Sequence, residues 1–158
     1  MHEIKRILVG LDYSEYSREA AKYAVYLAKK VGAAVDFVHV LELPAYLGTA
    51  VGLYGMASLK SHLKKEDGLK ESSLEELKQF IAEFKLDELE SSCRVVAGNP
   101  PSQIINLSVE LESDMIVLGT HGRAGISQLI IGSVAEKVVR KASCPVLTIK
   151  LTNQTFVI

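Results

Sequence analysis

Five short apolar runs alternate with longer segments of helical periodicity, and this alternation constrains the fold more than any other feature of the chain. The runs cover residues 4–11, 34–41, 92–97, 114–119 and 145–150. They are short and apolar enough to be strands that are buried on both faces. Strands that alternate with helices form a parallel sheet joined by right-handed crossovers. The sequence therefore predicts a doubly wound α/β fold: a five-stranded parallel sheet in the order 3-2-1-4-5, with helices on both faces.

The segments between these runs carry the signals of helix starts and ends. Ser14 is the predicted N-cap of a helix over residues 15–31, and a glycine follows that helix directly. Asn99 and two prolines precede a short helix. Another helix is predicted over residues 134–141. In the middle of the chain an apolar stripe predicts a helix that begins as early as residue 58, and the stripe consists of Leu74, Leu77, Ile81 and Phe84.

Composition and charge limit the classes of protein that this chain can be. The chain has 158 residues, of which 48% are hydrophobic and 23% charged, and its formal net charge is −1. These values predict one globular domain over residues 1–158 and argue against a general nucleic-acid binder, which needs a basic surface. No apolar run approaches the length of a membrane span. Cys93 and Cys144 are far apart and lack metal-ligand spacing, as is typical of a reduced, cytoplasmic protein.

A glycine-rich loop directly follows the fourth apolar run. After Gly119 and Gly122, nine further residues lead to Gly132 and Ser133, and a helical pattern begins at Val134. Glycines let backbone N–H groups approach an anion without an intervening Cβ, and a helix start adds free donors and partial positive charge. For any single glycine the alternative is an ordinary strand-to-helix turn. The full spacing in this context favours a nucleotide phosphate site.

The predicted fold places a ligand site at the same point. Doubly wound sheets bind ligands outside the carboxyl ends of their strands, where the strand order reverses. In the order 3-2-1-4-5 this crevice lies between the first and the fourth strand. These strands end at Leu11-Asp12 and at Leu118-Gly119, so the glycine loop falls at the crevice.

For each of four polar residues near the crevice, the sequence is compatible with two roles. Asp12 either caps the following helix or faces the ligand. His121 either pairs with a phosphate or hydrogen-bonds nearby backbone. Arg123, the fixed positive charge of the loop, either neutralises a terminal phosphate or is solvated. His39, inside the second run, is either a satisfied sheet residue or a ligand-binding residue, and the first of these is the commoner case.

The same residues resemble the universal stress protein family. The resemblance is carried by VLGTHGR at 117–123, IGSVAE at 131–136, CPVL at 144–147, ILVGLDYSE at 7–15 and the stretch 98–105. It covers essentially the whole chain, and the glycine motif is the signature of the ATP-binding branch of that family. One local departure is Gly10-Leu11, where family members often carry proline or threonine.

The resemblance implies ATP as the cofactor, with a divalent cation (Mg or Mn) held mainly by the phosphates and not by protein ligands. Asp12 would meet the ribose, with Leu11 beside it, and the backbone of Val40 would hold the adenine edge. The remaining residues would line the ribose and phosphate channel or bind phosphate oxygens at the helix start: Leu118, Gly119, Gly122, Arg123, Gly132, Ser133 and Val134.

Function is predicted as an ATP-dependent regulatory module of the stress response that acts through an unidentified protein partner. A slow or partner-activated ATPase and a nucleotide-free dimeric scaffold are the alternatives. The sequence contains no Gly-x4-Gly-Lys-Ser/Thr, Gly-x-Gly-x-x-Gly or Gly-x-Ser-x-Gly motif. No residue is predicted to be catalytic, because none resembles a general base aimed at a γ-phosphate.

Two further segments carry predictions of their own. The strand at 146–150 is expected at the edge of the sheet, and the family resemblance implies a homodimer through it. Residues 43–59 are uncharged and apolar but contain three glycines. They are interpreted either as a loop packed on its own domain or the dimer partner, or as a cover over bound nucleotide.

Overall fold

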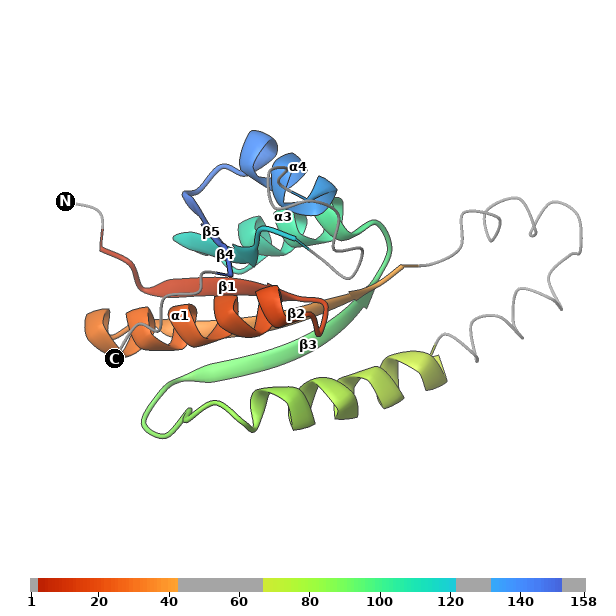
Figure 1. Cartoon of the computed structure of the whole chain (residues 1–158), viewed down its shortest axis with the longest axis horizontal. Coiled ribbons are helices and arrows are strands. Elements are labelled where there is room, and N and C mark those ends of the chain that lie inside the picture. Colours follow the sequence, from red (N-terminus) through yellow and green to blue (C-terminus); the bar gives the residue numbers. More distant parts are fainter. Residues whose placement is uncertain (1–2, 43–66, 122–131, 152–158) are drawn as a thin grey trace, which may run out of the picture.

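The computed structural model describes residues 3–42, 67–121 and 132–151 of the chain. Within these residues five strands form one parallel sheet in the order β3-β2-β1-β4-β5 (Figure 1). The observed architecture confirms the predicted fold class and strand order. The strands are β1 (Arg6–Leu11), β2 (Ala34–Leu41), β3 (Ser91–Ala97), β4 (Met115–Gly119) and β5 (Val146–Ile149).

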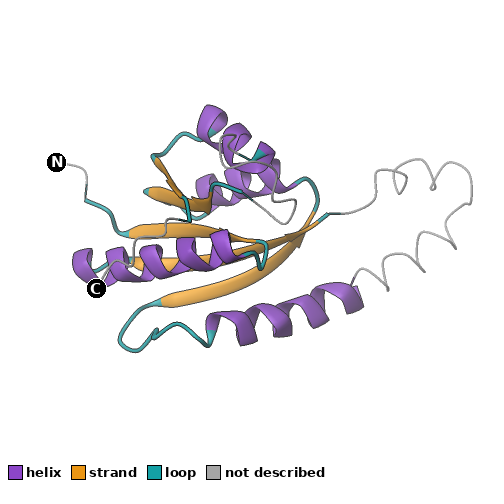
Figure 2. Cartoon of the chain, in the orientation of Figure 1, coloured by secondary structure: helices purple, strands orange, loops and turns teal. Residues whose placement is uncertain are grey.

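Helices cover both faces of the sheet (Figure 2). Helix α1 (Glu15–Val31) and the helical residues 67–81 lie on one face, and α3 (Pro100–Glu110) and α4 (Ser133–Lys141) lie on the other. None of the helices in these described ranges combines the length and the apolar character needed to cross a bilayer.

The two caps of α1 and the N-cap of α3 are those that the sequence predicts. Ser14 Oγ accepts a hydrogen bond from the backbone N–H of Ser17 at the start of α1, and Gly32 ends that helix with a φ of 73°. At the start of α3, the Asn99 side chain accepts from the backbone N–H of Ser102. Such local bonds satisfy backbone groups that the helices leave unpaired.

Two hydrophobic cores lie on opposite faces of the sheet. Ile7, Leu8 and Val9 of β1 are fully buried because their alternating side chains enter both cores. The face of α1 that packs on the sheet consists mainly of small residues, so that the helix lies close to β1 and β4. These residues are Ala20, Ala21, Ala24 and Ala28.

The predicted helix over the apolar stripe is confirmed in part. Helical residues end at 81, and Phe84 lies in the following turn, where its N–H donates to the Ile81 carbonyl. Its ring nevertheless stays buried and stacks on Phe37 with centroids 6.4 Å apart. The stripe thus predicts burial correctly but extends the helix too far. The expected early start at residue 58 and the segment 43–59 fall outside the described residues.

The amino-terminal ends of three strands are tied together by one buried carboxylate. Asp36 of β2 is 2% exposed, and it accepts hydrogen bonds from Arg6 Nη1 of β1 at 2.9 Å and from the Ser92 hydroxyl of β3. Burying a charge without such partners would cost several kcal/mol. These bonds hold β1, β2 and β3 in register and so align their carboxyl ends at the opposite edge.

Both cysteines are free thiols in this fold. Cys93 packs against the core under α1, and Cys144 packs against the core under α3 and α4. Burial raises the pKa of the Cys144 thiol. Because only a thiolate is a strong nucleophile or metal ligand, this environment favours an inert packing role for Cys144.

Candidate functional site

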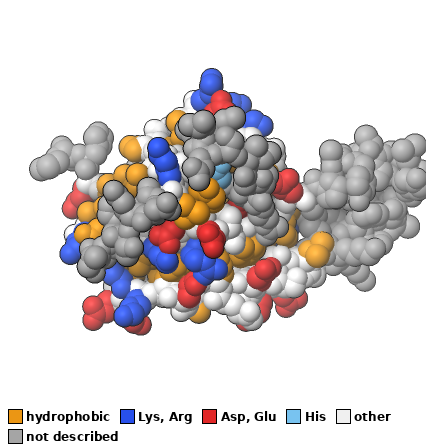
Figure 3. Space-filling view, in the orientation of Figure 1, with side chains coloured by type: hydrophobic (Ala, Val, Ile, Leu, Met, Phe, Trp, Pro, Cys, Tyr) orange, Lys and Arg blue, Asp and Glu red, His pale blue; other side chains and the backbone are white. Residues whose placement is uncertain are grey.

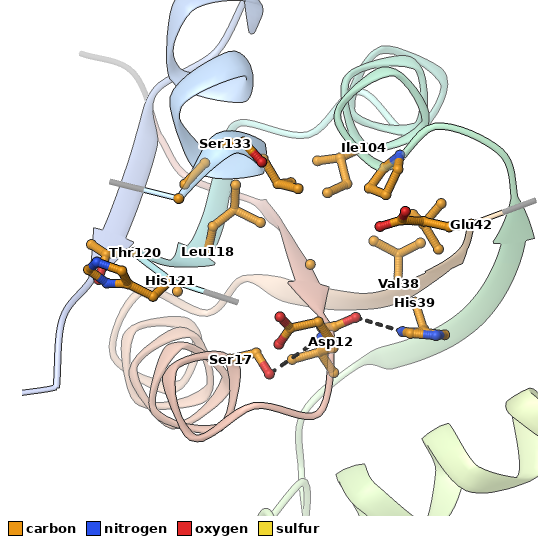
Figure 4. Close-up of a pocket in the computed structure, with 18 of the residues that line it drawn as sticks. Asp12, Ser17, Val38, His39, Glu42, Ile104, Leu118, Thr120, His121 and Ser133 are labelled. Carbon is orange, nitrogen blue, oxygen red and sulfur yellow. Dashed lines mark hydrogen bonds between the residues drawn. The ribbon is translucent and has the colours of Figure 1, made fainter. Parts of the chain in front are cut away.

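A pocket of about 570 Å³ opens at the carboxyl ends of the strands, between β1 and β4 (Figure 4). Its volume falls in the range of small-molecule sites in proteins. Among the predicted site residues, all those within the described ranges line it, while Gly122 and Arg123 fall outside those ranges. The predicted residues that line the pocket are Leu11, Asp12, Val40, Leu118, Gly119, Gly132, Ser133 and Val134.

The turn between β1 and α1 holds the Asp12 carboxylate at one side of the pocket. Asp12 Oδ1 accepts hydrogen bonds from the Ser14 backbone N–H at 3.0 Å and from the Ser14 hydroxyl at 2.5 Å. Asp12 therefore supports the N-cap of α1, whereas Ser14 is the N-cap itself. A carboxylate offers about four lone-pair sites, so that a supporting role is compatible with a ligand-facing one.

The start of α4 forms the opposite side of the pocket (Figure 4). Gly132 is the N-cap residue and makes no side-chain cap bond, because glycine has no side chain to accept one from a first-turn N–H group. The backbone N–H groups of Ser133, Val134 and Ala135 belong to the first turn, where an α-helix has no internal acceptor for them. These residues line the pocket. A helix start of this kind attracts an anion.

Gly119 of β4 lies so close to α1 that there is no room for a side chain at this position. A Cβ on Gly119 would lie 2.7 Å from the backbone carbon of Tyr16 and 3.0 Å from the backbone nitrogen of Ser17. The sequence predicts that the glycines of this loop leave room for a phosphate. At Gly119, in contrast, the missing side chain lets β4 and α1 pack together, and only the backbone of the residue contributes to the pocket.

Apolar side chains line the part of the pocket between Asp12 and α4. Val38 of β2, Ile104 of α3 and Leu118 of β4 all contribute to this lining (Figure 4). Gly10 of β1 lies beneath them: a Cβ there would come within 2.5 Å of Leu118 Cδ2 and 3.1 Å of Ile104 Cδ1. The Gly10-Leu11 pair that departs from the family pattern thus leaves space for these two side chains.

The two histidines near the pocket are held by nearby groups. His39 is 8% exposed, and its Nδ1 lies 2.8 Å from the Leu11 carbonyl oxygen. Because that oxygen can only accept, Nδ1 carries the hydrogen. His121 Nδ1 lies 3.0 Å from Thr120 Oγ1, and its ring lies 4.9 Å from the ring of Tyr16. Both histidines line the pocket.

Sequence reasoning did not assign several of the residues that line this pocket. Val38 and Glu42 flank the predicted Val40 at the carboxyl end of β2, where period-2 spacing could have indicated them. Ile104 belongs to the short helix that follows Asn99, and no motif in the sequence relates it to the pocket. No local signal relates Gly10 or Pro100 to the site, because their place depends on elements distant in the chain.

The arrangement has a defined chemical character. One pocket combines an apolar lining, a carboxylate at the end of β1 and the N-terminus of α4. It lies at the point where the strand order of a doubly wound sheet reverses, which is the usual ligand position in such folds. The protein is therefore an α/β protein whose pocket suits a ligand with an apolar ring, hydroxyl groups and negative charge.

Comparison with known proteins identifies the family. A model of the universal stress protein family matches residues 3–150, so the chain belongs to this family. Universal stress protein MJ0531 of Methanocaldococcus jannaschii is 33% identical over 92% of this chain and 82% of its own length. Universal stress protein MJ0577 of the same organism is 28% identical over 94% of this chain and 96% of its own length.

Solved structures share the fold. The structure of MJ0577 superposes with a TM-score of 0.77 over 97% of this chain and 100% of that chain, at 24% identity. A universal stress protein solved in complex with cAMP superposes with a TM-score of 0.62 at 20% identity, over 94% of this chain and 98% of that chain. The match to the family model and the identity to MJ0531 confirm the family assigned by resemblance from the sequence.

Proposed function

We propose that this protein binds ATP in the pocket between β1 and β4 and acts as a nucleotide-dependent regulatory module in a stress response. The proposal rests on one observation: a single pocket contains an apolar lining, the Asp12 carboxylate and the start of α4. An adenine nucleotide presents a flat ring, ribose hydroxyls and phosphates, and each of these suits one of the three features. The cAMP complex of a protein with this fold supports an adenine nucleotide as the ligand.

Each part of ATP has a complementary surface in the proposed pose. The adenine ring lies against Val38 and Ile104, with its edge at the Val40 backbone. The ribose hydroxyls donate to Asp12. The phosphates receive hydrogen bonds from the first turn of α4 at Ser133 and Val134. A divalent cation enters with the phosphates and is held mainly by their oxygens, as Mg²⁺ often is.

The proposal is tested by asking what the protein carries and what it binds. Mass analysis of a freshly purified, denatured sample is expected to release an adenine nucleotide. Titration calorimetry of the emptied protein should give binding for ATP, weaker binding for AMP and weaker still for adenosine, because each lost phosphate removes contacts with α4. If ATP, AMP and adenosine all fail to bind, the proposed function is wrong and a nucleotide-free scaffold is favoured.

Asp12→Asn is expected to weaken the binding of ATP and of adenosine by the same factor, about tenfold. The amide oxygen keeps the bonds from Ser14, whereas the charge and one acceptor facing the ribose are lost. Calorimetry with both ligands measures this. Because the two ligands share the ribose, a loss confined to ATP would contradict the ribose role of Asp12. A melting curve serves as the control for folding.

Hydrolysis is the alternative use of the same pocket. An ATP turnover assay, with and without cell extract, separates a regulatory module from a slow or partner-activated ATPase. ATP turnover that appears only with cell extract would favour a partner-activated ATPase and would indicate that the extract contains the protein partner. The cytoplasmic location expected from the sequence stays a prediction.

We further propose a homodimer through β5, which lies at one edge of the sheet. The carbonyls of Pro145 and Ile149 accept from the N–H groups of Ile116 and Thr120 near β4. Because successive residues of a strand direct their backbone groups to opposite sides, those of Thr148 face away from β4, toward an edge at which no other described strand lies. An open edge of this kind readily pairs with a second strand.

Thr148→Pro is expected to convert the dimer to a monomer, because it removes the N–H that faces the open edge without removing one that pairs with β4. Thr148→Val keeps the N–H and serves as the matched control. Sedimentation velocity of both variants and of a chain that ends after Lys150 measures the result. A dimer that persists in Thr148→Pro would place the interface elsewhere. The chain ends in the apolar residues Phe156-Val157-Ile158, which a monomer would be expected to expose, but residues 152–158 lie outside the described ranges.

A further inference from the structure

Tyr13, the residue directly after Asp12, has a backbone conformation that non-glycine residues seldom adopt. Its φ is 65°, in the left-handed region. For an L-residue this region crowds the Cβ against the following carbonyl. Such strain persists only where the surroundings hold it, and it is concentrated at functional sites. The conformation at Tyr13 bends the chain between Asp12 and Ser14, whose N–H and hydroxyl bind the Asp12 carboxylate.

The side chain of Tyr13 contacts residues of two other elements. Its ring lies 4.5 Å from the ring of His39, which bonds the Leu11 carbonyl, and 5.4 Å from the ring of Phe80 in an edge-to-face arrangement. Its hydroxyl donates to the Ser73 carbonyl at 3.4 Å. Phe80 and Ser73 both belong to the helical residues 67–81. The turn at the pocket is therefore attached to this helix.

Helix α1 also contacts helix 67–81 at Phe80. The Arg18 guanidinium lies 4.6 Å from the centre of the Phe80 ring, and Arg18 also pairs with Glu83 beyond the end of the helix. Neither Tyr13 nor Phe80 lines the pocket. Tyr13 adjoins two residues that do line it: Asp12 precedes it in the chain, and the ring of His39 lies against its ring.

We propose that Tyr13 is a positioning residue that couples nucleotide binding at Asp12 to the docking of helix 67–81. This inference rests on the proposed function and adds a regulated element to it. When the helix is docked, Phe80 and His39 hold Tyr13 in its left-handed conformation, and Asp12 is in place for the ribose. When the helix undocks, Tyr13 relaxes to an ordinary conformation and turns Asp12 away from the ribose.

Coupling of this kind is reciprocal. If docking of the helix strengthens nucleotide binding, nucleotide must stabilise the docked helix by the same factor. The surface of helix 67–81 then reports whether the pocket is filled. Such coupling requires a part of the protein with two states, whose equilibrium is shifted both by the nucleotide and by helix 67–81. The strained backbone of Tyr13, together with its ring contacts, supplies these two states.

Three substitutions at Tyr13 separate the backbone effect from the ring effect. Tyr13→Phe keeps the ring and should bind ATP within about twofold of the parent. Tyr13→Gly loses the ring but adopts positive φ without strain, and should bind about threefold more weakly. Tyr13→Ala loses the ring and disfavours positive φ, and should bind about tenfold more weakly. Phe80→Leu, which alters only the helix side of the contact, should weaken binding about threefold.

A double-mutant cycle distinguishes positioning from simple packing. If Tyr13 acts through Asp12, Tyr13→Ala should cost less than about twofold in ATP affinity when Asp12→Asn is already present. If Tyr13 had a merely structural role, Tyr13→Ala would lower the ATP affinity by the same factor in the parent and in Asp12→Asn. Val25→Ala, in the same core but on α1 and away from Tyr13, is the matched control for general destabilisation and should leave ATP affinity unchanged. Melting curves accompany every variant, and Tyr13→Gly and Phe80→Leu carry the test if Tyr13→Ala fails to fold.

Hydrogen exchange tests the reciprocal effect. In the parent, ATP should slow hydrogen exchange over residues 67–81 more than over residues 24–31 of α1. In Tyr13→Ala, ATP should slow exchange in the two segments to the same extent. If the parent binds ATP but Tyr13→Ala binds equally well, or loses the same factor with Asp12→Asn, the coupling is wrong while the proposed function stands. Equal slowing of both segments in the parent overturns the coupling in the same way. If the parent binds no adenine nucleotide, both proposals are wrong.

Discussion

Ser133→Asp is expected to lower the affinity for ATP about a hundredfold while leaving the affinity for adenosine within about twofold. Ser133 is the first residue of α4, it is exposed, and it lines the pocket where the phosphates are proposed to bind. A carboxylate there competes with the phosphates for the first-turn N–H groups and repels them. Two unit charges about 4 Å apart near a protein surface interact by roughly 4 kcal/mol, and a hundredfold change requires about 2.7 kcal/mol.

The matched control for this prediction is Ser133→Asn, which has the same shape as the aspartate but no charge. It should bind ATP nearly as the parent does. The aspartate also interacts favourably with the helix N-terminus, so that Ser133→Asp should melt no lower than the parent. Calorimetry with ATP, AMP and adenosine, together with melting curves, measures all three effects. Equal ATP affinity in the aspartate and asparagine variants would place the phosphates away from α4.

The second prediction is a large loss of stability in Gly119→Ala, about 3 kcal/mol in the free energy of unfolding. The added Cβ would lie 2.7 Å from both the backbone carbon and the Cβ of Tyr16, and 3.0 Å from the Ser17 nitrogen. Because two of these atoms are backbone atoms at the start of α1, no side-chain rotation relieves the contact. The helix start must move away from β4, and with it the turn that carries Asp12.

Two other glycines supply graded controls for Gly119→Ala. At Gly68 a Cβ meets nothing within 4 Å, so that Gly68→Ala should keep stability or raise it by up to about 1 kcal/mol. At Gly10 the nearest atom is the end of the Leu118 side chain, which can rotate, so that Gly10→Ala should cost less than Gly119→Ala. Urea unfolding of the three variants measures this order. Equal stability of Gly119→Ala and Gly68→Ala would show that α1 adjusts freely.

The distribution of charge is consistent with a small-molecule site built locally. On the face seen in Figure 3, acidic and basic side chains are interspersed, without a broad area of one sign. With a formal net charge of −1, an anionic ligand gains little from the overall field. None of the described residues that line the pocket is a lysine or an arginine, so that in this part of the chain the proposed attraction comes from the backbone N–H groups at the start of α4. This is why Ser133→Asp has the largest expected effect on binding.

The predictions that the structure confirms concern features that nearby residues determine. The Ser14 cap involves Ser17, and the Asn99 cap involves Ser102, each within one helical turn. Strand positions follow from apolar runs, which are continuous segments of sequence. The alternation of strands and helices predicts a parallel sheet but does not by itself fix the strand order. The order 3-2-1-4-5 is one that places the glycine loop at a crevice.

The sequence alone determined which segments form strands and which form helices, because periodicity and caps are local signals. Its glycine spacing predicted the edge of the sheet at which the pocket opens. The tertiary structure alone decided what individual residues do there. Gly119 packs against Tyr16 on another element, and Tyr13 contacts Phe80 on a helix far along the chain. Such contacts depend on distances between elements that are remote in sequence, and no local pattern encodes those distances.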